Sequence, residues 1–290
     1  MNTLLELFLS CFGFLVGLLC LRAGQTRRMH TQSTTYDLKF PADLAREDVE
    51  RFLASLTGLL PPWWRRIVAQ PVVSFELVAE QGKISHRVSV PATFRGYLES
   101  SFQAHLPGLR YEPVEAGDPW LPRKAAEYRT STDARPLRVD AEGIAAGILA
   151  AVQPLDKDER LIVQWMLTAG WPVRPPRASK PSDNRLISDV ELMNSNEQVA
   201  ARRNKLRAPL LLAVGRIGVQ AGGRHRQVQL LRRAEGPLHA TRAPGAHLRR
   251  RLLPSRVVAR RITDRTVPLT RFPSLLNTEE VAGLLGWPIK

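Results

Sequence analysis

The segment VVSFELVAEQGKISHRVSV, residues 72–90, decides the fold class. Residues 72–79 and residues 84–90 are rich in apolar and β-branched side chains and largely alternate with polar ones, which is typical of half-buried strands. Between them, residues 81–83 (QGK) form a turn, because glycine adopts the backbone conformations that tight turns require. The segment therefore predicts an antiparallel β-hairpin.

The residues around this hairpin complete a repeating pattern. A strand at residues 34–40 (TTYDLKF) precedes it, followed by a helix after Pro41 whose apolar residues recur at helical spacing. A second helix starts at Pro91, and residues 109–114 form a last strand. The order βαββαβ is that of a ferredoxin-like fold, so we expect the first ferredoxin-like subdomain at residues 34–116.

The second half of the chain repeats this order less cleanly. Residues 159–168 (ERLIVQWMLT) form the strongest predicted strand, with residues 209–219 (PLLLAVGRIGV) as its hairpin partner. A strand at residues 137–139 precedes them. We expect a second ferredoxin-like subdomain at residues 127–253, carrying a polar insertion at residues 172–207. A chance similarity between two α+β stretches is the alternative.

The predicted fold class is therefore α+β, with an N-terminal transmembrane helix followed by two ferredoxin-like subdomains. Residues 1–28 form the anchor and its basic flank, residues 117–126 link the subdomains, and residues 254–290 form a basic C-terminal segment. The apolar residues predicted to be buried on the strands are Phe75, Leu77, Ile162, Val163, Trp165, Leu211 and Val214.

The predicted membrane anchor is the apolar run at residues 4–21 (LLELFLSCFGFLVGLLCL). As a helix it is about 27 Å long, enough to cross the hydrocarbon core of a bilayer. Arg22, Arg27 and Arg28 follow it and no basic residue precedes it, which predicts a single-pass protein of the cell membrane with a cytoplasmic body. A cleaved signal peptide is the alternative, but the run lacks a basic segment before it.

Positive charge is concentrated in one part of the chain. The net charge is +15, and between Ala201 and Arg271 there are 18 Lys and Arg residues against two acids, Glu235 and Asp264. Such a field attracts polyanions, including nucleic acid and anionic lipid headgroups. An arginine-rich composition without a binding role is the other interpretation.

Within this stretch, a group of arginines is the predicted phosphate-binding site. Asp264 is the one acid near them in sequence, so we expect their side chains to be unpaired and solvated. The predicted nucleic-acid-binding residues are Arg249, Arg250, Arg251, Arg256, Arg260, Arg261 and Arg265. A second mixed cluster, residues 63–66 (WWRR), suits base stacking, a bilayer interface or simple packing.

The sequence predicts no enzyme, and no catalytic, cofactor-binding or metal-binding residue. Residues 218–225 (GVQAGGRH) have the outline of a phosphate-binding loop, but Arg224 and His225 stand where that loop needs Lys and Ser or Thr. The histidines are scattered, without the spacing of a zinc site. Cys11 and Cys20 both lie in the N-terminal apolar run, which leaves no disulfide framework elsewhere.

Several segments together resemble a known family, the membrane-associated conjugative DNA-transfer ATPases of type IV secretion systems, which are relatives of the FtsK/HerA-type DNA pumps. The resemblance is to the region that precedes the motor domain. The segments that carry it are residues 63–66 (WWRR), 73–91 (VSFELVAEQGKISHRVSVP), 98–115 (LESSFQAHLPGLRYEPVE), 148–168 (ILAAVQPLDKDERLIVQWMLT), 208–219 (APLLLAVGRIGV) and 272–290 (FPSLLNTEEVAGLLGWPIK).

This resemblance implies a role beside DNA translocation without the motor, because no GxxxxGK[ST] motif occurs in the chain. We therefore expect a membrane-anchored, non-catalytic module, resembling part of a coupling protein, that contacts DNA or a separate motor ATPase through its basic surface. Other type IV secretion components and further copies of the chain are additional expected partners. The alternative function is a membrane-tethered assembly scaffold that binds protein partners or anionic lipid and has no role with nucleic acid.

Overall fold

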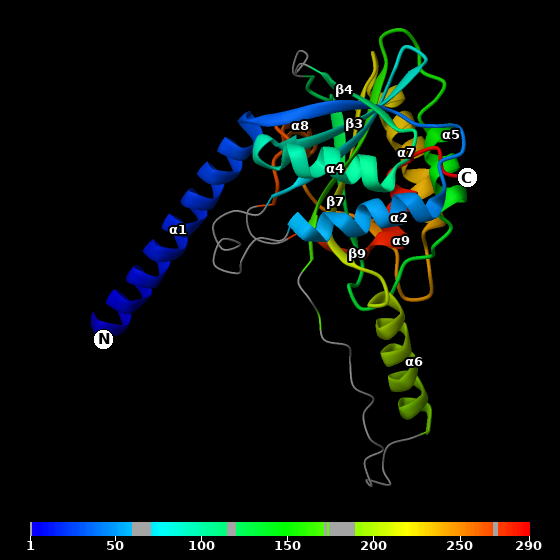
Figure 1. The fold of residues 1–290 in the computed structure, drawn as a ribbon. Helices are drawn as coiled ribbons and strands as arrows, with labels where there is room; N and C mark the ends of the chain where they lie inside the picture. The colour runs from blue at the N-terminus through cyan, green and yellow to red at the C-terminus, as the bar shows by residue number, and fades with distance from the viewer. Residues whose placement is uncertain (1, 60–70, 115–119, 171–172, 174–188, 269–271) are drawn as a thin grey trace.

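The computed structural model describes residues 2–59, 71–114, 120–170, 173, 189–268 and 272–290. At its centre lies one nine-stranded sheet (Figure 1). The strands are β1 (Ser33–Lys39), β2 (Val73–Glu80), β3 (Lys83–Pro91), β4 (Arg110–Val114), β5 (Lys124–Thr130), β6 (Arg160–Ala169), β7 (Leu210–Gln220), β8 (Leu248–Arg250) and β9 (Ser274–Asn277). Their order is β4-β1-β3-β2-β6-β7-β5-β8, with β9 also paired to β7, and every pairing is antiparallel.

The predicted hairpin at residues 72–90 is confirmed as β2 and β3. Glu80 lies opposite Lys83, so the loop consists of two residues, Gln81 and Gly82. Both have positive φ, 48° and 79°, as a two-residue turn matched to the strand twist requires. The hairpin is thus closed locally by the turn that the sequence predicts.

Helices cover both faces of the sheet. They are α1 (Asn2–Thr31), α2 (Arg46–Ser55), α4 (Arg95–His105), α5 (Ala141–Ala151), α6 (Asp189–Lys205), α7 (Arg224–Ala240), α8 (Ser255–Thr263) and α9 (Thr278–Leu284), with 3-10 turns η1 (Leu56–Leu59) and η2 (Ala92–Phe94). Apolar residues of α2, α4, α5, α7 and α9 join one large core on the first face. Helix α8 packs on the second face, where Val258 and Ile262 contact Ala125 and Ile162.

Strand alternation divides the side chains between these two faces. On β6, Val163 and Trp165 point into the large core, while Ile162 and Met166 point to the second face. A Cβ on Gly215 would lie 2.6 Å from the Trp165 ring, so glycine at this position leaves the room that the indole fills. All seven apolar residues predicted to be buried on the strands are buried, which confirms that prediction.

The prediction of two ferredoxin-like subdomains, at residues 34–116 and 127–253, is wrong. β2 and β6 pair over eight residues, from Val73 opposite Leu167 to Glu80 opposite Arg160. This long-range pairing joins the strands of both segments into one sheet. The strand orders of the two halves are related, β4-β1-β3-β2 and β8-β5-β7-β6, but the halves share one sheet and one large core.

The end of the chain belongs to this core. β9 pairs with β7, and α9 packs against α2 and α5. Trp287 is buried and its ring lies 5.8 Å from the rings of Phe52 and Phe75 and 4.7 Å from that of Phe40. The last part of the predicted C-terminal segment is therefore built into the fold.

The predicted anchor at residues 4–21 forms part of α1, which projects away from the sheet (Figure 1). Among the residues that the structure describes, however, no helix combines the length and the apolar character that crossing a membrane requires. Glu6 interrupts the apolar run, and α1 continues through a polar and basic sequence as far as Thr31. The prediction of a transmembrane helix at residues 4–21 is therefore wrong, and so is the single-pass membrane localisation that depended on it.

Other sequence-based boundaries also change. The first strand of the second half is β5, not the predicted strand at residues 137–139, which has no regular secondary structure. α7 continues through Gly236 and Pro237 to Ala240, although both residues disfavour the interior of a helix. The aromatic and basic cluster at residues 63–66 lies outside the described residues, as does most of the predicted insertion before α6.

Candidate nucleic-acid interface

A row of polar side chains crosses the second face of the sheet. Glu76 on β2 lies opposite Gln164 on β6, which lies opposite Arg216 on β7, which in turn lies opposite Glu127 on β5. All four are buried. Arg216 donates to Glu127 Oε2 at 3.0 Å and to Gln164 Oε1 at 3.1 Å, and Gln164 donates to Glu76 Oε1 at 3.0 Å. The row is a continuous hydrogen-bonded chain.

Three of the seven predicted phosphate-binding arginines end on this row. Arg251 and Arg261 both donate to Glu127, Arg261 at 3.3 Å to Oε2. Arg265 binds Glu76 with two hydrogen bonds, of 2.7 and 2.9 Å. The expectation that these three side chains are unpaired is therefore wrong. They fasten α8 and its flanking residues to the sheet.

The charges in the row are stabilised mutually. Burial alone would raise the pKa of Glu127, but the neighbouring charges of Arg216, Arg261 and Arg251 outweigh it and lower that pKa. Burial likewise opposes ionisation of Glu76, and Arg265 reverses the effect, so the pKa of Glu76 is also lowered. Both carboxylates are therefore ionised at neutral pH.

Arg216 is charged as well, although burial lowers its pKa to about 10. Its guanidinium is satisfied on every side, because it also donates to the backbone oxygens of Arg261 and Thr266. Four arginines thus share two carboxylates in this cluster. The cluster of four arginines and two carboxylates therefore carries a net positive charge beneath α8.

The other four predicted arginines are exposed, and the described part of the chain contains no ion-pair partner for them. Arg249 and Arg250 lie on β8, at one edge of the sheet. Arg256 and Arg260 lie four residues apart on α8, one helical turn from each other. These four retain the free guanidinium groups that phosphate binding needs.

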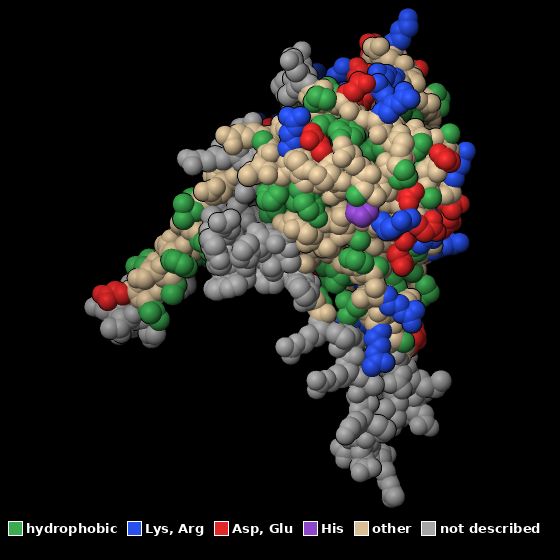
Figure 2. All heavy atoms as spheres, viewed as in Figure 1, with side chains coloured by type: hydrophobic (Ala, Val, Ile, Leu, Met, Phe, Trp, Pro, Cys, Tyr) green, Lys and Arg blue, Asp and Glu red, His purple; other side chains and the backbone are tan. Residues whose placement is uncertain are grey.

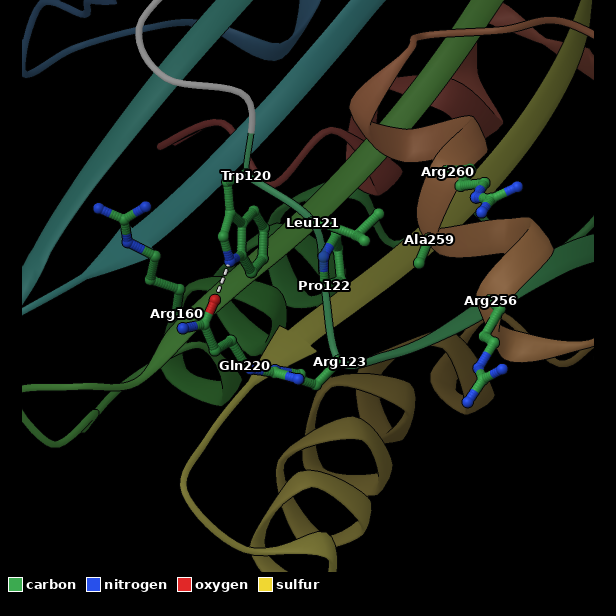
Figure 3. Close-up of a pocket in the computed structure, with 9 residues that line it drawn as sticks. All are labelled: Trp120, Leu121, Pro122, Arg123, Arg160, Gln220, Arg256, Ala259 and Arg260. Atoms are coloured by element: carbon green, nitrogen blue, oxygen red, sulfur yellow. Dashed lines mark hydrogen bonds between the residues drawn. The ribbon is translucent and has the colours of Figure 1, made fainter.

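Arg256 and Arg260 line a pocket of about 750 Å³ (Figure 3). Among the described residues its lining includes four arginines and no carboxylate. The lining residues are Trp120, Leu121, Pro122, Arg123, Arg160, Gln220, Arg256, Ala259 and Arg260. In Figure 3, the Trp120–Pro122 segment lies between Arg160 on one side and α8 on the other. We call this hollow the arginine pocket.

The aromatic wall of the arginine pocket is fixed in place. The indole Nε1 of Trp120 donates to Oε1 of Gln220, and the backbone oxygen of Trp120 accepts from Thr263 Oγ1 at 2.7 Å. Arg160 is partly occupied, because it pairs with Glu80. Arg123, by contrast, is exposed and has no ion-pair partner in the described ranges. The site therefore offers a positioned ring and three free cations.

Trp120 and Arg123 were not predicted as site residues because both lie within the predicted linker, residues 117–126. A signal was present, since Trp120, Arg123 and Lys124 follow one another within a few residues. Both residues lie close to α8 because they precede β5, on which α8 packs, and the sequence did not predict β5. The backbone N–H of Ala125 donates a hydrogen bond of 2.8 Å to Ser255 Oγ, which ties the start of α8 to that strand.

The glycine segment at residues 218–225 does not form a phosphate-binding loop. Gly218 lies inside β7, where an added Cβ would be 2.7 Å from Pro122. Only Ala221–Gly223 connect β7 to α7. Beside them is a second hollow of about 440 Å³, which shares Arg123 and Gln220 with the arginine pocket.

Arg249 and Arg250 line a separate pocket of about 440 Å³, together with Arg242, His239 and His247. Its lining also includes Tyr128 and Glu235, and Tyr128 donates a hydrogen bond of 2.5 Å to Glu235. Burial, followed by the charge of Glu235, raises the pKa of Tyr128, so this hydroxyl stays protonated. The basic character of the interface thus extends from α8 to β8.

The face that carries α2 and α4 differs. Figure 2 shows acidic and basic side chains interspersed there, and pairs such as Arg46–Glu50 and Arg95–Glu99 neutralise each other. No group of three His, Cys, Asp or Glu residues suited to a metal ion occurs among the described residues.

Comparison of the sequence with protein-family models gives no match, and comparison with curated proteins gives none either.

Proposed function

We propose that this protein is a non-catalytic DNA-binding module that holds the phosphate backbone through the arginine pocket and the neighbouring arginines of β8. The observation that carries the proposal is the lining of the pocket, where Arg123, Arg256 and Arg260 are free and no described lining residue is acidic. Guanidinium groups bind phosphate oxygens in a bidentate manner, which suits them to this task.

The electrostatics of the second face support the same proposal. The cluster of four arginines and two glutamates beneath α8 keeps a positive excess close to the exposed Arg256 and Arg260. A polyanion approaching α8 therefore meets a positive potential over an extended area. The resemblance to conjugative DNA-transfer proteins implies that such a module would hold DNA beside a separate motor ATPase.

A salt titration of DNA binding by the full chain tests the proposal. Each phosphate contact contributes roughly 0.7 to 0.9 to the slope of log affinity against log salt. The double variant Arg256→Ala/Arg260→Ala should therefore bind more weakly, with a slope smaller by roughly 1.4 to 1.8. The loss should be similar for unrelated sequences, because phosphate contacts carry no base information.

The control removes the same charge elsewhere. Arg202 and Arg207 are exposed arginines at the end of α6 and beyond it, and neither lines the arginine pocket. Arg202→Ala/Arg207→Ala should leave most of the affinity and slope intact. If both double variants bind DNA as tightly as the parent chain at every salt concentration, the proposal fails and assembly with protein or anionic lipid becomes the better explanation.

A further inference from the structure

The arginine pocket has an apolar wall as well as a basic rim. Trp120, Leu121, Pro122 and Ala259 supply the wall. Leu121 is 52% exposed, so its apolar surface is accessible to a ligand in the pocket. A site for phosphate alone would not need this surface. The lining fits a ligand that is flat and apolar at one end and anionic at the other.

Trp120 is suited to stacking because its ring is already held. The hydrogen bond to Gln220 orients the indole edge, and the bond from Thr263 fixes its backbone. A ring positioned in advance loses little conformational entropy when a flat ligand packs on it. The Gln220 side chain comes from the end of β7, so the aromatic wall is supported by the sheet itself.

The cations line the pocket at several points. Arg123 follows Trp120 by three residues, and Arg256 and Arg260 belong to the part of the lining contributed by α8, which lies across Leu121 and Pro122 from the indole (Figure 3). The volume of about 750 Å³ lies within the range of pockets that bind small ligands or single nucleotide units. A nucleobase with its own phosphate group matches both parts of the lining.

We infer that the arginine pocket binds an unpaired nucleobase of a single DNA strand, stacked on Trp120, with the adjoining phosphates on Arg123, Arg256 and Arg260. This inference rests on the proposed function and narrows it to single-stranded DNA. In a duplex the faces of the bases are stacked on one another, so Trp120 has no access to them. Every base has an aromatic face, so the preference is for strandedness and not for sequence.

A strand is favoured over a free nucleotide by the surroundings of the pocket. Exposed arginines continue beyond it, along residues 249–256 to the β8 edge. A single nucleotide would use the pocket alone, whereas a strand would also engage these arginines. An excess of mononucleotide should therefore fail to displace a bound strand at matched phosphate concentration.

The test uses the full chain and three fluorescent DNA probes of equal length. One is a single strand of thymidines, one has the same backbone with abasic sites in place of the bases, and one is a duplex. Stacking of one base on an aromatic ring is worth about 1 kcal/mol or more, so the thymidine strand should bind about fivefold or more tighter than the abasic strand. When affinities are compared per phosphate group, the duplex should bind about as weakly as the abasic strand.

Variants at Trp120 connect this difference to the pocket. Trp120→Leu should abolish the discrimination between thymidine and abasic strands and leave the salt slope unchanged, and Trp120→Phe should retain most of it. Equal binding of the thymidine and abasic strands by the parent chain would overturn the inference, and this comparison does not depend on a variant. Failure of the proposed function looks different, because then Arg256→Ala/Arg260→Ala would change neither affinity nor salt slope for any probe.

Discussion

At the residue scale, His86 is a partly buried histidine beside apolar residues of the main core. It lies on β3 between Leu38 of β1 and Leu77 of β2, and its ring is 5.2 Å from that of Phe40. Its Nδ1 is buried and finds no partner among the described residues. Burial lowers the pKa of His86 to about 4, so the side chain is neutral in the folded protein.

This makes a pH-dependent prediction. The unfolded chain binds a proton at His86 below a pH of about 6.5, while the folded chain does not until about pH 4. His86 therefore does not reduce the free energy of unfolding above the unfolded pKa. As pH decreases between the two pKa values, His86 lowers this free energy by up to about 1.4 kcal/mol per pH unit. Replacing His86 with Leu should remove that share of the slope.

Urea unfolding at several pH values between 7 and 4.5 provides the measurement. The matched control is His225→Gln, because His225 is an exposed histidine at the start of α7. Its variant should keep the pH dependence of the parent chain. A His86→Leu protein whose stability falls with pH as steeply as that of the parent would contradict the prediction.

The fate of the predicted arginines explains what the sequence could and could not reveal at this scale. Arg251, Arg261 and Arg265 were judged by the acids near them in the chain. Their partners Glu127 and Glu76 lie 124, 134 and 189 residues away. Alternation in the predicted strand at residues 72–79 puts Glu76 on the face opposite Phe75 and Leu77, but Glu127 lies on β5, which was not predicted. Local patterns also do not encode a helix that covers that face. Free and structural arginines therefore looked alike.

At the element scale, α8 is held by two different interactions. Val258 and Ile262 pack on the apolar part of the second face. Arg251 before the helix and Arg261 within it both bind Glu127, whose side chain is fully buried. Because Arg256 and Arg260 lie on this helix, the ionic contacts also position the arginine pocket.

Replacing Glu127 with Gln should loosen this arrangement. Removing one partner of a buried ion pair leaves the others uncompensated, which costs about 3–5 kcal/mol. The folded-state pKa of Glu127 is lowered, so its contribution is present above the unfolded pKa and is lost as pH falls through the folded one. The difference between the two proteins should therefore be largest near neutral pH and shrink in acid.

The control for this prediction is Glu112→Gln on β4. Glu112 pairs with Lys39 at the surface, where both side chains are more than half exposed. Such pairs contribute about 0–1 kcal/mol, so the control should be close to the parent chain in urea unfolding. Equal stability of the Glu127→Gln and Glu112→Gln proteins at pH 7 would show that the buried row does not hold α8.

The strands themselves were largely predictable at this scale. β2, β3, β6 and β7 begin and end within one or two residues of the predicted strands, because each carries several β-branched or aromatic residues. β5 was missed because KAAEYRT contains two alanines and three charged residues. Its strand conformation is imposed by β7 and β8 on either side, a tertiary effect that no local pattern contains.

At the scale of the whole molecule, the pairing of β2 with β6 turns two halves into one body. The main core contains residues of both halves, including Leu53 of α2 and Leu230 of α7, and the C-terminal Trp287 packs against Phe52 and Phe75. Edge pairing between distant strands leaves no trace in residue periodicity. This is why the sequence predicted two subdomains and the structure has a single sheet.

A continuous sheet and core should unfold in one cooperative transition. Leu53→Ala in the first half and Leu230→Ala in the second remove matched, fully buried side chains, and each should cost about 2.7–5.0 kcal/mol. Each variant should shift the whole transition, since neither half has a core of its own. Calorimetry should give one endotherm in all three proteins, with equal calorimetric and van 't Hoff enthalpies.

Hydrogen exchange in urea shows which strands open together. The amides of β1 and β3 should lose protection together with those of β5 and β7 in both variants. Protection that survives in β5 and β7 after β1 and β3 have opened in the Leu53→Ala protein would mean that the two halves fold independently despite their shared sheet.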